Sequence, residues 1–129
     1  MNSYEDLEVW QKSVALATRL YKITDPFPSP EKFGLISQIR RAATSIPANI
    51  AEGWGRGSTK EYIQFLFVAR GSLMELETHM IIAQNLGYLA SEQLSDLRNA
   101  TRQVGKMLNG LIKALKARDR FAQPLNPGP

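Results

Sequence analysis

Four successive segments of the chain repeat apolar residues at alternating spacings of three and four, the period of an α-helix packed along one face. No segment shows the competing period of two that is typical of a half-buried strand. The four segments are residues 6–24, 30–51, 59–86 and 92–117. The sequence therefore predicts an all-α chain with four helices. Their apolar seams are Leu7, Trp10, Val14, Ala17 and Tyr21; Ile36, Ile39, Ala43, Ile46 and Ile50; Tyr62, Leu66, Ala69, Leu73, Leu76, Met80 and Ala83; and Leu94, Leu97, Thr101, Val104, Leu108, Leu111 and Leu115.

The lengths of these segments and of the links between them predict the topology. Long helices joined by short links favour an antiparallel, up-down-up-down four-helix bundle whose neighbouring helices cross at about 20°. A chain of 129 residues is long enough for one such domain, which we assign to residues 1–120. The tail, residues 121–129, contains three prolines and is predicted to be disordered.

The junction between the second and third predicted helices contains several helix signals. Pro47 lies inside the second helix, where it removes a backbone donor, so we predict a kink there. Gly53, Gly55 and Gly57 are expected to end this helix. Ser58 and Glu61 have the spacing of a capping box, which predicts that the third helix begins immediately after Ser58.

Three runs of sequence carry a resemblance to a known family. The run SIPANIAEGWGR, the opening YEDLEVWQKS and the late GKMLNGLIKAL resemble the four-helix-bundle family of 23S rRNA intervening-sequence proteins. The resemblance covers nearly all of the chain except residues 121–129. It implies a ring-shaped homopentamer, the form of the family's known members. A distant branch of the family acts as an accessory to retroelement reverse transcriptases, so the resemblance also implies a partner enzyme.

Composition limits the classes of site and the cellular location. The absence of cysteine excludes a disulfide scaffold, a thiolate metal site and a cysteine nucleophile, and favours a reducing compartment. Met1 is followed by the acidic Glu5, Asp6 and Glu8 rather than by the basic and apolar regions of a signal peptide. No apolar run reaches the roughly 18 residues that span a bilayer. We therefore expect a cytoplasmic protein with no membrane partner.

The excess positive charge is concentrated in the last part of the chain. Residues 1–92 carry a net charge of −1 and residues 93–129 a net charge of +5. Helical periodicity places six of the cations opposite the leucine seam of the fourth helix, which predicts contact with the phosphates of RNA or DNA. The alternative is a solvated helix face. The predicted nucleic-acid-binding residues are Arg98, Arg102, Lys106, Lys113, Lys116 and Arg120, with Arg56 and Lys60 from the turn before the third helix.

The first and third helices each carry a second apolar stripe, about 120° from the first. A large exposed apolar surface is unusual on a monomer, so these stripes predict a homo-oligomer. The alternative is a wide core that absorbs them. The number five comes from the family resemblance alone. The predicted interface residues are Val9, Leu16, Leu20 and Ile23 on the first helix and Ile63, Phe67, Met74 and Ile81 on the third.

We predict no catalytic, metal or cofactor site. His79 is the only histidine, and Glu75 and Glu77 diverge because they are two positions apart on a helix. The run Gly53–Lys60 places glycines before a helix N-terminus, where anions are favoured. It lacks the preceding strand and the Gly-Lys-Ser/Thr order of a phosphate loop, so we interpret it as a helix-ending turn. Trp54 in this turn either covers the core or stacks on a base.

Two functional hypotheses remain open. The first is a non-catalytic oligomer that binds structured RNA or a DNA–RNA duplex through its basic stripes, as an accessory to another enzyme. The second is a protein-interaction or assembly module in which the stripe serves solubility. A small molecule in the central channel of a ring is a third hypothesis.

Overall fold

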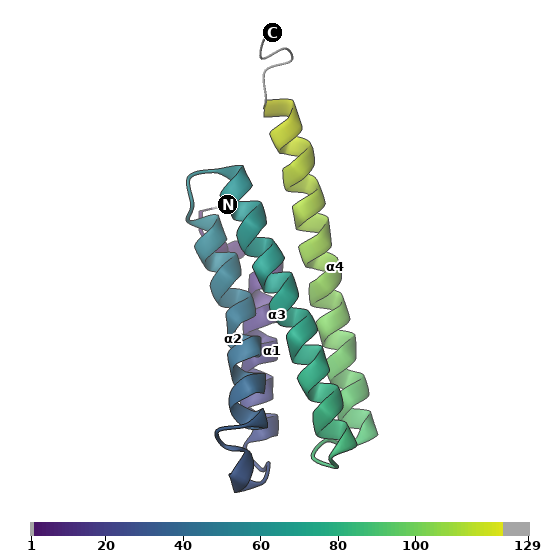
Figure 1. The fold of residues 1–129 in the computed structure, drawn as a ribbon. Helices are drawn as coiled ribbons and strands as arrows, with labels where there is room; N and C mark the ends of the chain where they lie inside the picture. The colour runs from purple at the N-terminus through teal and green to yellow at the C-terminus, as the bar shows by residue number, and fades with distance from the viewer. Residues whose placement is uncertain (1, 123–129) are drawn as a thin grey trace.

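The computed structural model describes residues 2–122, and their side chains as far as Asp119. It contains the helices α1 (Glu8–Thr24), α2 (Leu35–Trp54), α3 (Thr59–Asn85) and α4 (Ser91–Ala122), with short 3-10 turns at Tyr4–Asp6 and Ser29–Glu31. Each helix runs antiparallel to the next in an elongated bundle (Figure 1). The predicted up-down-up-down, all-α fold is confirmed. Contacts run around the bundle from α1 to α2, α3 and α4 and back to α1, and they are most extensive between α2 and α3.

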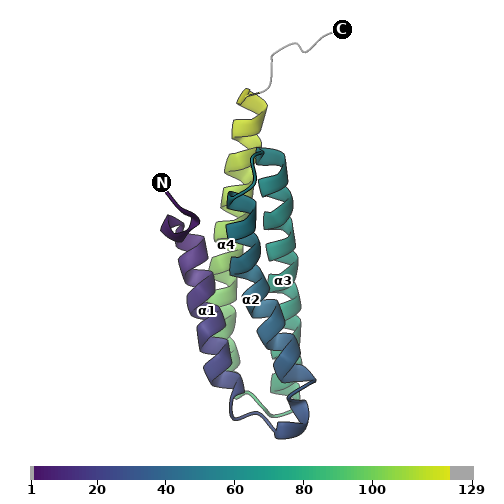
Figure 2. The ribbon, with the colours of Figure 1, turned by 90° about the vertical axis from the view of Figure 1, so that its left-hand side faces the viewer.

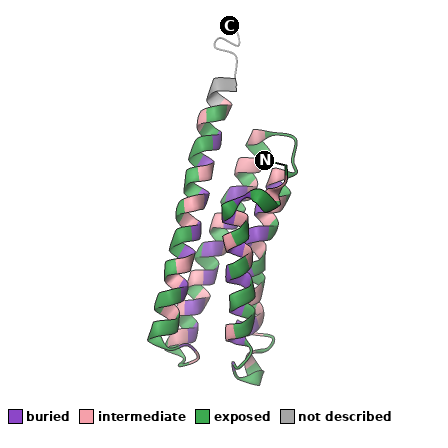
Figure 3. Cartoon of the chain, turned by 180° about the vertical axis from the view of Figure 1, so that it is seen from behind, coloured by how far each residue is buried: buried purple, intermediate pink, exposed green. Residues whose placement is uncertain are grey.

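The core follows three of the four predicted seams. On α2, α3 and α4 the seam residues are buried or half-buried, and several, such as Ile46, Leu76 and Leu108, have no exposed surface. Figure 3 shows buried segments on the inner sides of the helices and exposed segments outside. Apolar burial of this kind contributes roughly 25 cal/mol per Å² and is the main source of stability in such a bundle.

The buried face of α1 differs from the prediction. Tyr21, which was assigned to the seam, is 44% exposed, whereas Leu16 and Leu20 are in the core. The actual buried face includes Ser13 and Thr24, whose hydroxyls donate to the backbone carbonyls of Val9 (2.6 Å) and Leu20 (2.7 Å). These local bonds remove most of the cost of burying a hydroxyl. The predicted exposed second stripe on this helix is therefore wrong, because Val9, Leu16 and Leu20 are core residues.

The start of α2 lies later than predicted. Ser29–Glu31 form a separate 3-10 turn, and α2 begins only at Leu35. The Glu31 carboxylate caps it, with Oε1 accepting from the Leu35 amide (3.2 Å) and Oε2 from the Tyr88 hydroxyl (2.9 Å). A Cβ at Gly34 would lie 2.8 Å from Glu31 Oε1, so a larger residue here would displace the Glu31 carboxylate from this position. The first amide of α2 is therefore satisfied by the side chain of Glu31.

The α2–α3 junction confirms the capping box and changes the role of one glycine. The Glu61 amide donates to Ser58 Oγ (3.1 Å), and α3 begins at the predicted residue. Gly53 does not end α2 but lies buried inside it, where a Cβ would be 2.8 Å from Phe65 Cβ. Gly53 thus allows α2 and α3 to approach closely. The helix continues through Pro47, and the kink at this residue stays a prediction.

The ends of α3 and α4 follow from their sequences. Gly87 has a φ of +82°, its amide donates to the Gln84 carbonyl, and the Tyr88 amide donates to the Ala83 carbonyl, as in a Schellman motif. In contrast, α4 continues past the predicted end to Ala122, since residues 118–122 include no helix breaker before Pro124. Its last turns extend beyond the α2–α3 junction (Figure 2). The predicted disorder is thus wrong for 121–122, while 123–129 lie outside the described residues.

Candidate nucleic-acid interface

The outer face of α4 carries a line of exposed cations. Arg102, Lys106, Lys113 and Lys116 are exposed and lie opposite the buried Leu97, Val104 and Leu108. Over residues 2–119, no carboxylate forms an ion pair with any of these four cations. We call this surface, Arg102, Lys106, Lys113 and Lys116, the basic face of α4. Its charges are open to solvent and to an anionic partner.

The two ends of the predicted stripe differ from its centre. Arg98 is half-buried, and its Nε is fully buried without a hydrogen-bond partner within the described part of the chain. It is therefore less available to a phosphate than the four exposed cations. The backbone of Arg120 lies in α4, but its side chain is outside the described residues, so its contact with nucleic acid stays a prediction.

Helix α3 adds a cation that the sequence analysis missed. Arg70 Nη1 donates to Asn109 Oδ1 of α4 (3.0 Å), and the Arg70 guanidinium lies 4.7 Å from the Phe67 ring centroid. Lys116 Nζ lies 5.1 Å from the same centroid. A groove of about 480 Å³ runs between the two helices, lined by Phe67, Arg70, Asn109, Ile112, Lys113 and Lys116. The position of Arg70 beside the basic face depends on how α3 packs against α4, which the sequence alone does not show.

The two predicted cations near the α2–α3 turn are placed differently from each other. Arg56 pairs with Glu52 (2.9 Å) and lies 4.9 Å from the Phe65 ring centroid. Phe65 and Phe67 are two positions apart and project from different sides of α3, so Arg56 is separated from the basic face of α4. Lys60 is exposed and lies on the same side of α3 as Phe67, two helical turns away. Of the two, Lys60 is the better placed to extend the basic face.

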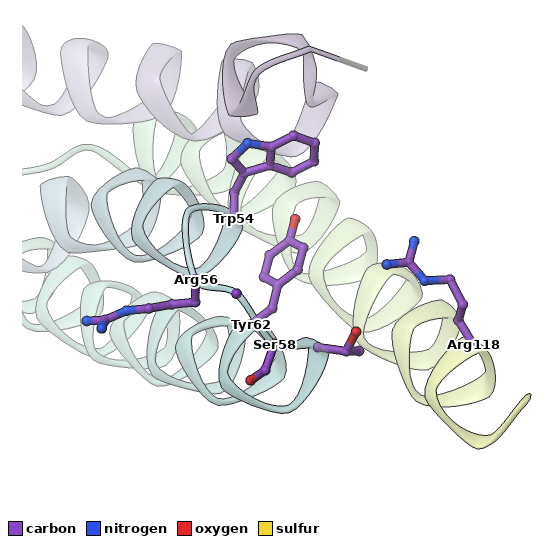
Figure 4. Close-up of a pocket in the computed structure, with 7 residues that line it drawn as sticks. Trp54, Arg56, Ser58, Tyr62 and Arg118 are labelled. Carbon is purple, nitrogen blue, oxygen red and sulfur yellow. The ribbon is translucent and has the colours of Figure 1, made fainter. Parts of the chain in front are cut away.

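A small pocket opens at the α2–α3 turn. It has a volume of about 250 Å³ and is lined by Trp54, Tyr62 and Arg118 together with Arg56 and residues 57–59. Figure 4 shows Arg118 across the pocket from Tyr62, with Arg56 extending the opposite way. Trp54 packs edge-on against Tyr62 (6.4 Å, 89°) and is partly buried on the core, which supports its role as a lid. Burial raises the pKa of the Tyr62 hydroxyl, and the charge of Arg118 partly opposes this.

The predicted interface residues on α3 lie at the surface or close to it. Phe67 and Met74 are exposed, and Ile63 and Ile81 are half-buried. Three further exposed apolar residues, Val68 (52%), Ile82 (41%) and Leu86 (55%), extend this outer face of α3. On α1, by contrast, three of the four predicted residues are buried. The fourth, Ile23, is half-buried and packs against the core. Most of the large exposed apolar side chains among the described residues therefore lie on α3 or at its C-terminal end.

Acidic and histidine side chains form no candidate metal site in the part of the chain that the structure describes. No group of three or more His, Asp or Glu side chains there has the arrangement to hold a metal ion. His79 Nε2 lies 3.4 Å from Glu75 Oε1, one turn earlier on α3, as an ordinary helical pair. Within residues 2–122, no helix has both the length and the hydropathy required to cross a membrane.

Comparison with known proteins agrees with this fold. The crystal structure of a protein of unknown function from the S23 ribosomal protein family of Bacteroides thetaiotaomicron VPI-5482 is similar, with a TM-score of 0.73 and 30% sequence identity. The alignment covers 81% of this chain and 98% of that one. No curated protein matches the chain. The family model described as 23S rRNA-intervening sequence protein matches residues 5–110, and the chain therefore belongs to this family.

Proposed function

We propose that this protein is a non-catalytic, oligomeric binding protein that contacts the phosphate backbone of structured RNA or of a nucleic-acid duplex through the basic face of α4. The observation that carries the proposal is the line of four exposed cations without ion-paired carboxylates over residues 2–119. These cations are spread over about four turns of one helix, so several can reach successive phosphates of a duplex. Such contacts recognise backbone charge and shape rather than base sequence.

Self-association would multiply this contact. The outer face of α3 exposes the apolar side chains of Phe67, Met74 and Ile82, and the basic face of α4 adjoins it at Phe67 and Lys116. We propose that copies of the chain associate through α3, most simply as the homopentamer that the family resemblance implies. Each copy would then add one basic face, and the linked sites would bind one nucleic acid far more tightly than a single copy.

The test is a charge reversal on α4 with a control matched in charge. We expect Arg102→Glu, Lys106→Glu and Lys113→Glu together to weaken binding of a labelled blunt-ended RNA duplex by at least about 100-fold near 50 mM salt, because three phosphate contacts become repulsive. The control reverses three cations of α1, Lys12→Glu, Arg19→Glu and Lys22→Glu, and should weaken binding only a few-fold. Fluorescence anisotropy measures both affinities.

The outcomes separate this function from the alternative. Equal losses in the two triple variants would show that only net charge matters and would contradict a specific role for α4. If the wild type binds no duplex or structured RNA at this salt concentration, the protein is instead an assembly module that uses α3 alone. A circular dichroism melt of each variant confirms that the bundle is intact, since all six positions lie outside the core.

A further inference from the structure

A second basic surface lies where the end of α1 meets the start of α2. It is at the opposite end of the bundle from the α2–α3 turn (Figure 2). A depression of about 400 Å³ there is lined by three cations, Lys32, Arg40 and Arg41, and by the rings of Tyr21 and Phe33. No carboxylate lines it among the residues that the structure describes. The lining thus combines positive charge with two aromatic rings, and that of Phe33 is almost fully exposed.

Arg40 is held in place before any ligand binds. Its guanidinium lies 4.5 Å from the Tyr21 ring centroid. Nε donates to Thr24 Oγ1 (3.0 Å), and Nη2 donates to the Tyr21 carbonyl (3.1 Å). A guanidinium has five N–H donors, so these two bonds fix its plane and leave others for an anion. Such a fixed cation binds with less loss of side-chain entropy than a mobile lysine.

Phe33 is presented to solvent on a constrained turn. Its side chain is 88% exposed, and Lys32 Nζ lies 5.5 Å from its ring centroid. The turn is constrained on both sides, because Glu31 caps α2 at Leu35 and accepts from the Tyr88 hydroxyl. An exposed phenylalanine is ordinary alone, but here it stands beside three cations on a fixed support.

An unpaired nucleotide segment fits this combination of groups. A base can stack on an open aromatic ring while adjacent phosphates contact cations, as in proteins that bind single strands. A duplex offers no such base, because its bases are already stacked and paired, so Phe33 would gain nothing from it. An acidic peptide would satisfy the cations but would leave the ring without a flat partner.

From these groups we infer that the surface formed by Tyr21, Lys32, Phe33, Arg40 and Arg41 binds single-stranded nucleic acid, with one base stacked on Phe33. The inference concerns a different face from the proposed function and rests on it only in taking nucleic acid as the ligand. The two faces together bind a structured nucleic acid that carries an unpaired segment. The basic face of α4 contacts the paired part, and Phe33 contacts the unpaired part.

The test compares two probes on one set of variants. The probes are a fluorescein-labelled oligouridylate of about ten nucleotides and a blunt-ended RNA duplex, at about 50 mM salt. We expect Phe33→Ala to weaken oligouridylate binding by at least about tenfold, the loss of one stacked base, and to leave duplex binding unchanged. Phe33→Tyr keeps the ring and should bind within about twofold of the wild type. The control Thr18→Ala truncates an exposed side chain of α1 that lies outside both proposed surfaces and should change neither affinity.

The results that differ from these expectations contradict either the binding of a single strand at Phe33 or the proposed role of α4. Unchanged oligouridylate binding in Phe33→Ala, or equal losses for both probes, contradicts stacking on Phe33. A fall in oligomer mass in Phe33→Ala with unchanged oligouridylate binding assigns the surface to contacts between copies. If the wild type binds the duplex but not oligouridylate, this inference alone fails. If it binds oligouridylate but not the duplex, the proposed role of α4 alone fails.

Discussion

Helices α3 and α4 are neighbours whose inner faces are similar in chemistry and whose outer faces differ. Both bury aliphatic side chains along the core, for example Leu76 on α3 and Leu108 on α4. Outward, α3 exposes Met74 and Ile82, whereas α4 exposes Arg102 and the lysines of its basic face. The inner faces explain why the chain forms a bundle. The outer faces differ in chemistry, and this difference is the basis of the proposal that α3 contacts an apolar partner and α4 an anionic one.

The two outer faces meet at the aromatic ring of Phe67. Arg70 and Lys116 both lie against this ring, so the apolar face ends in a ring covered by cations. A subunit interface formed by α3 would therefore have basic side chains along one edge. Such an arrangement suits a polar rim around an apolar centre. It also means that assembly and nucleic-acid binding can be changed separately only by substitutions away from Phe67.

The largest expected effect is on assembly. Met74→Glu and Ile82→Glu together place two carboxylates on the outer face of α3, where an interface without partners for them would lose several kcal/mol per charge. We expect the double variant to be a folded monomer by light scattering. The control Gln38→Glu and Ala48→Glu adds the same charge to exposed positions of α2 and should remain oligomeric. A monomeric wild type at micromolar concentration would contradict association through α3.

The next effect concerns stability and compares two residues of α3. Leu76 has no exposed surface, and Met74, two positions earlier, is 58% exposed. We expect Leu76→Ala to lower the free energy of unfolding by about 2–5 kcal/mol. The second comparison uses the Met74→Glu, Ile82→Glu variant, which we expect to be monomeric. Replacing the glutamate introduced at position 74 with alanine should change the free energy of unfolding of this variant by less than about 0.5 kcal/mol. Urea unfolding measures both, and similar losses would show that the outer face also stabilises the single chain.

The smallest expected effect lies away from both outer faces, at Tyr88. Its pKa is raised by its hydrogen bond to Glu31, by burial and by the negative charge of Glu31. A raised folded-state pKa means that the bond stabilises the fold below the ordinary tyrosine pKa of 10.0 and is lost as pH rises through the folded value. We expect Tyr88→Phe to lower the urea midpoint slightly at pH 7, with the difference from wild type shrinking above pH 10. Neither assembly nor duplex binding should change, and a constant difference across this range would exclude the hydroxyl as the cause.

Sequence periodicity predicted α2, α3 and α4 well because the apolar residues at helical spacing in these segments are the residues that the bundle buries. It failed on α1 because Ser13 and Thr24 bond to their own helix and so occupy core positions that an apolar pattern does not show. The start of α2 depends on Glu31 and Tyr88, which are distant in sequence. No local rule of capping could have shown this contact.

The candidate sites were predictable to different degrees. The basic face of α4 follows directly from helical spacing. In contrast, the roles of Arg70 and Arg40 depend on contacts with other helices, at Asn109 of α4 and at Tyr21 and Thr24 of α1. The exposure of Phe33 depends on the turn before α2, whose position the sequence analysis placed inside a helix. Interhelical geometry, which one sequence does not contain, decides these features.

The central claim is that the basic face of α4 contacts phosphates, and the salt dependence of duplex binding tests it most directly. Each phosphate contact contributes about −0.9 to the slope of log affinity against log salt concentration. For the Arg102→Glu, Lys106→Glu, Lys113→Glu variant we predict a slope shallower than that of the wild type by about 2–3, while the α1 control keeps nearly the wild-type slope. A variant whose slope equals that of the wild type would contradict the claim, because the lost cations would then have made no phosphate contact.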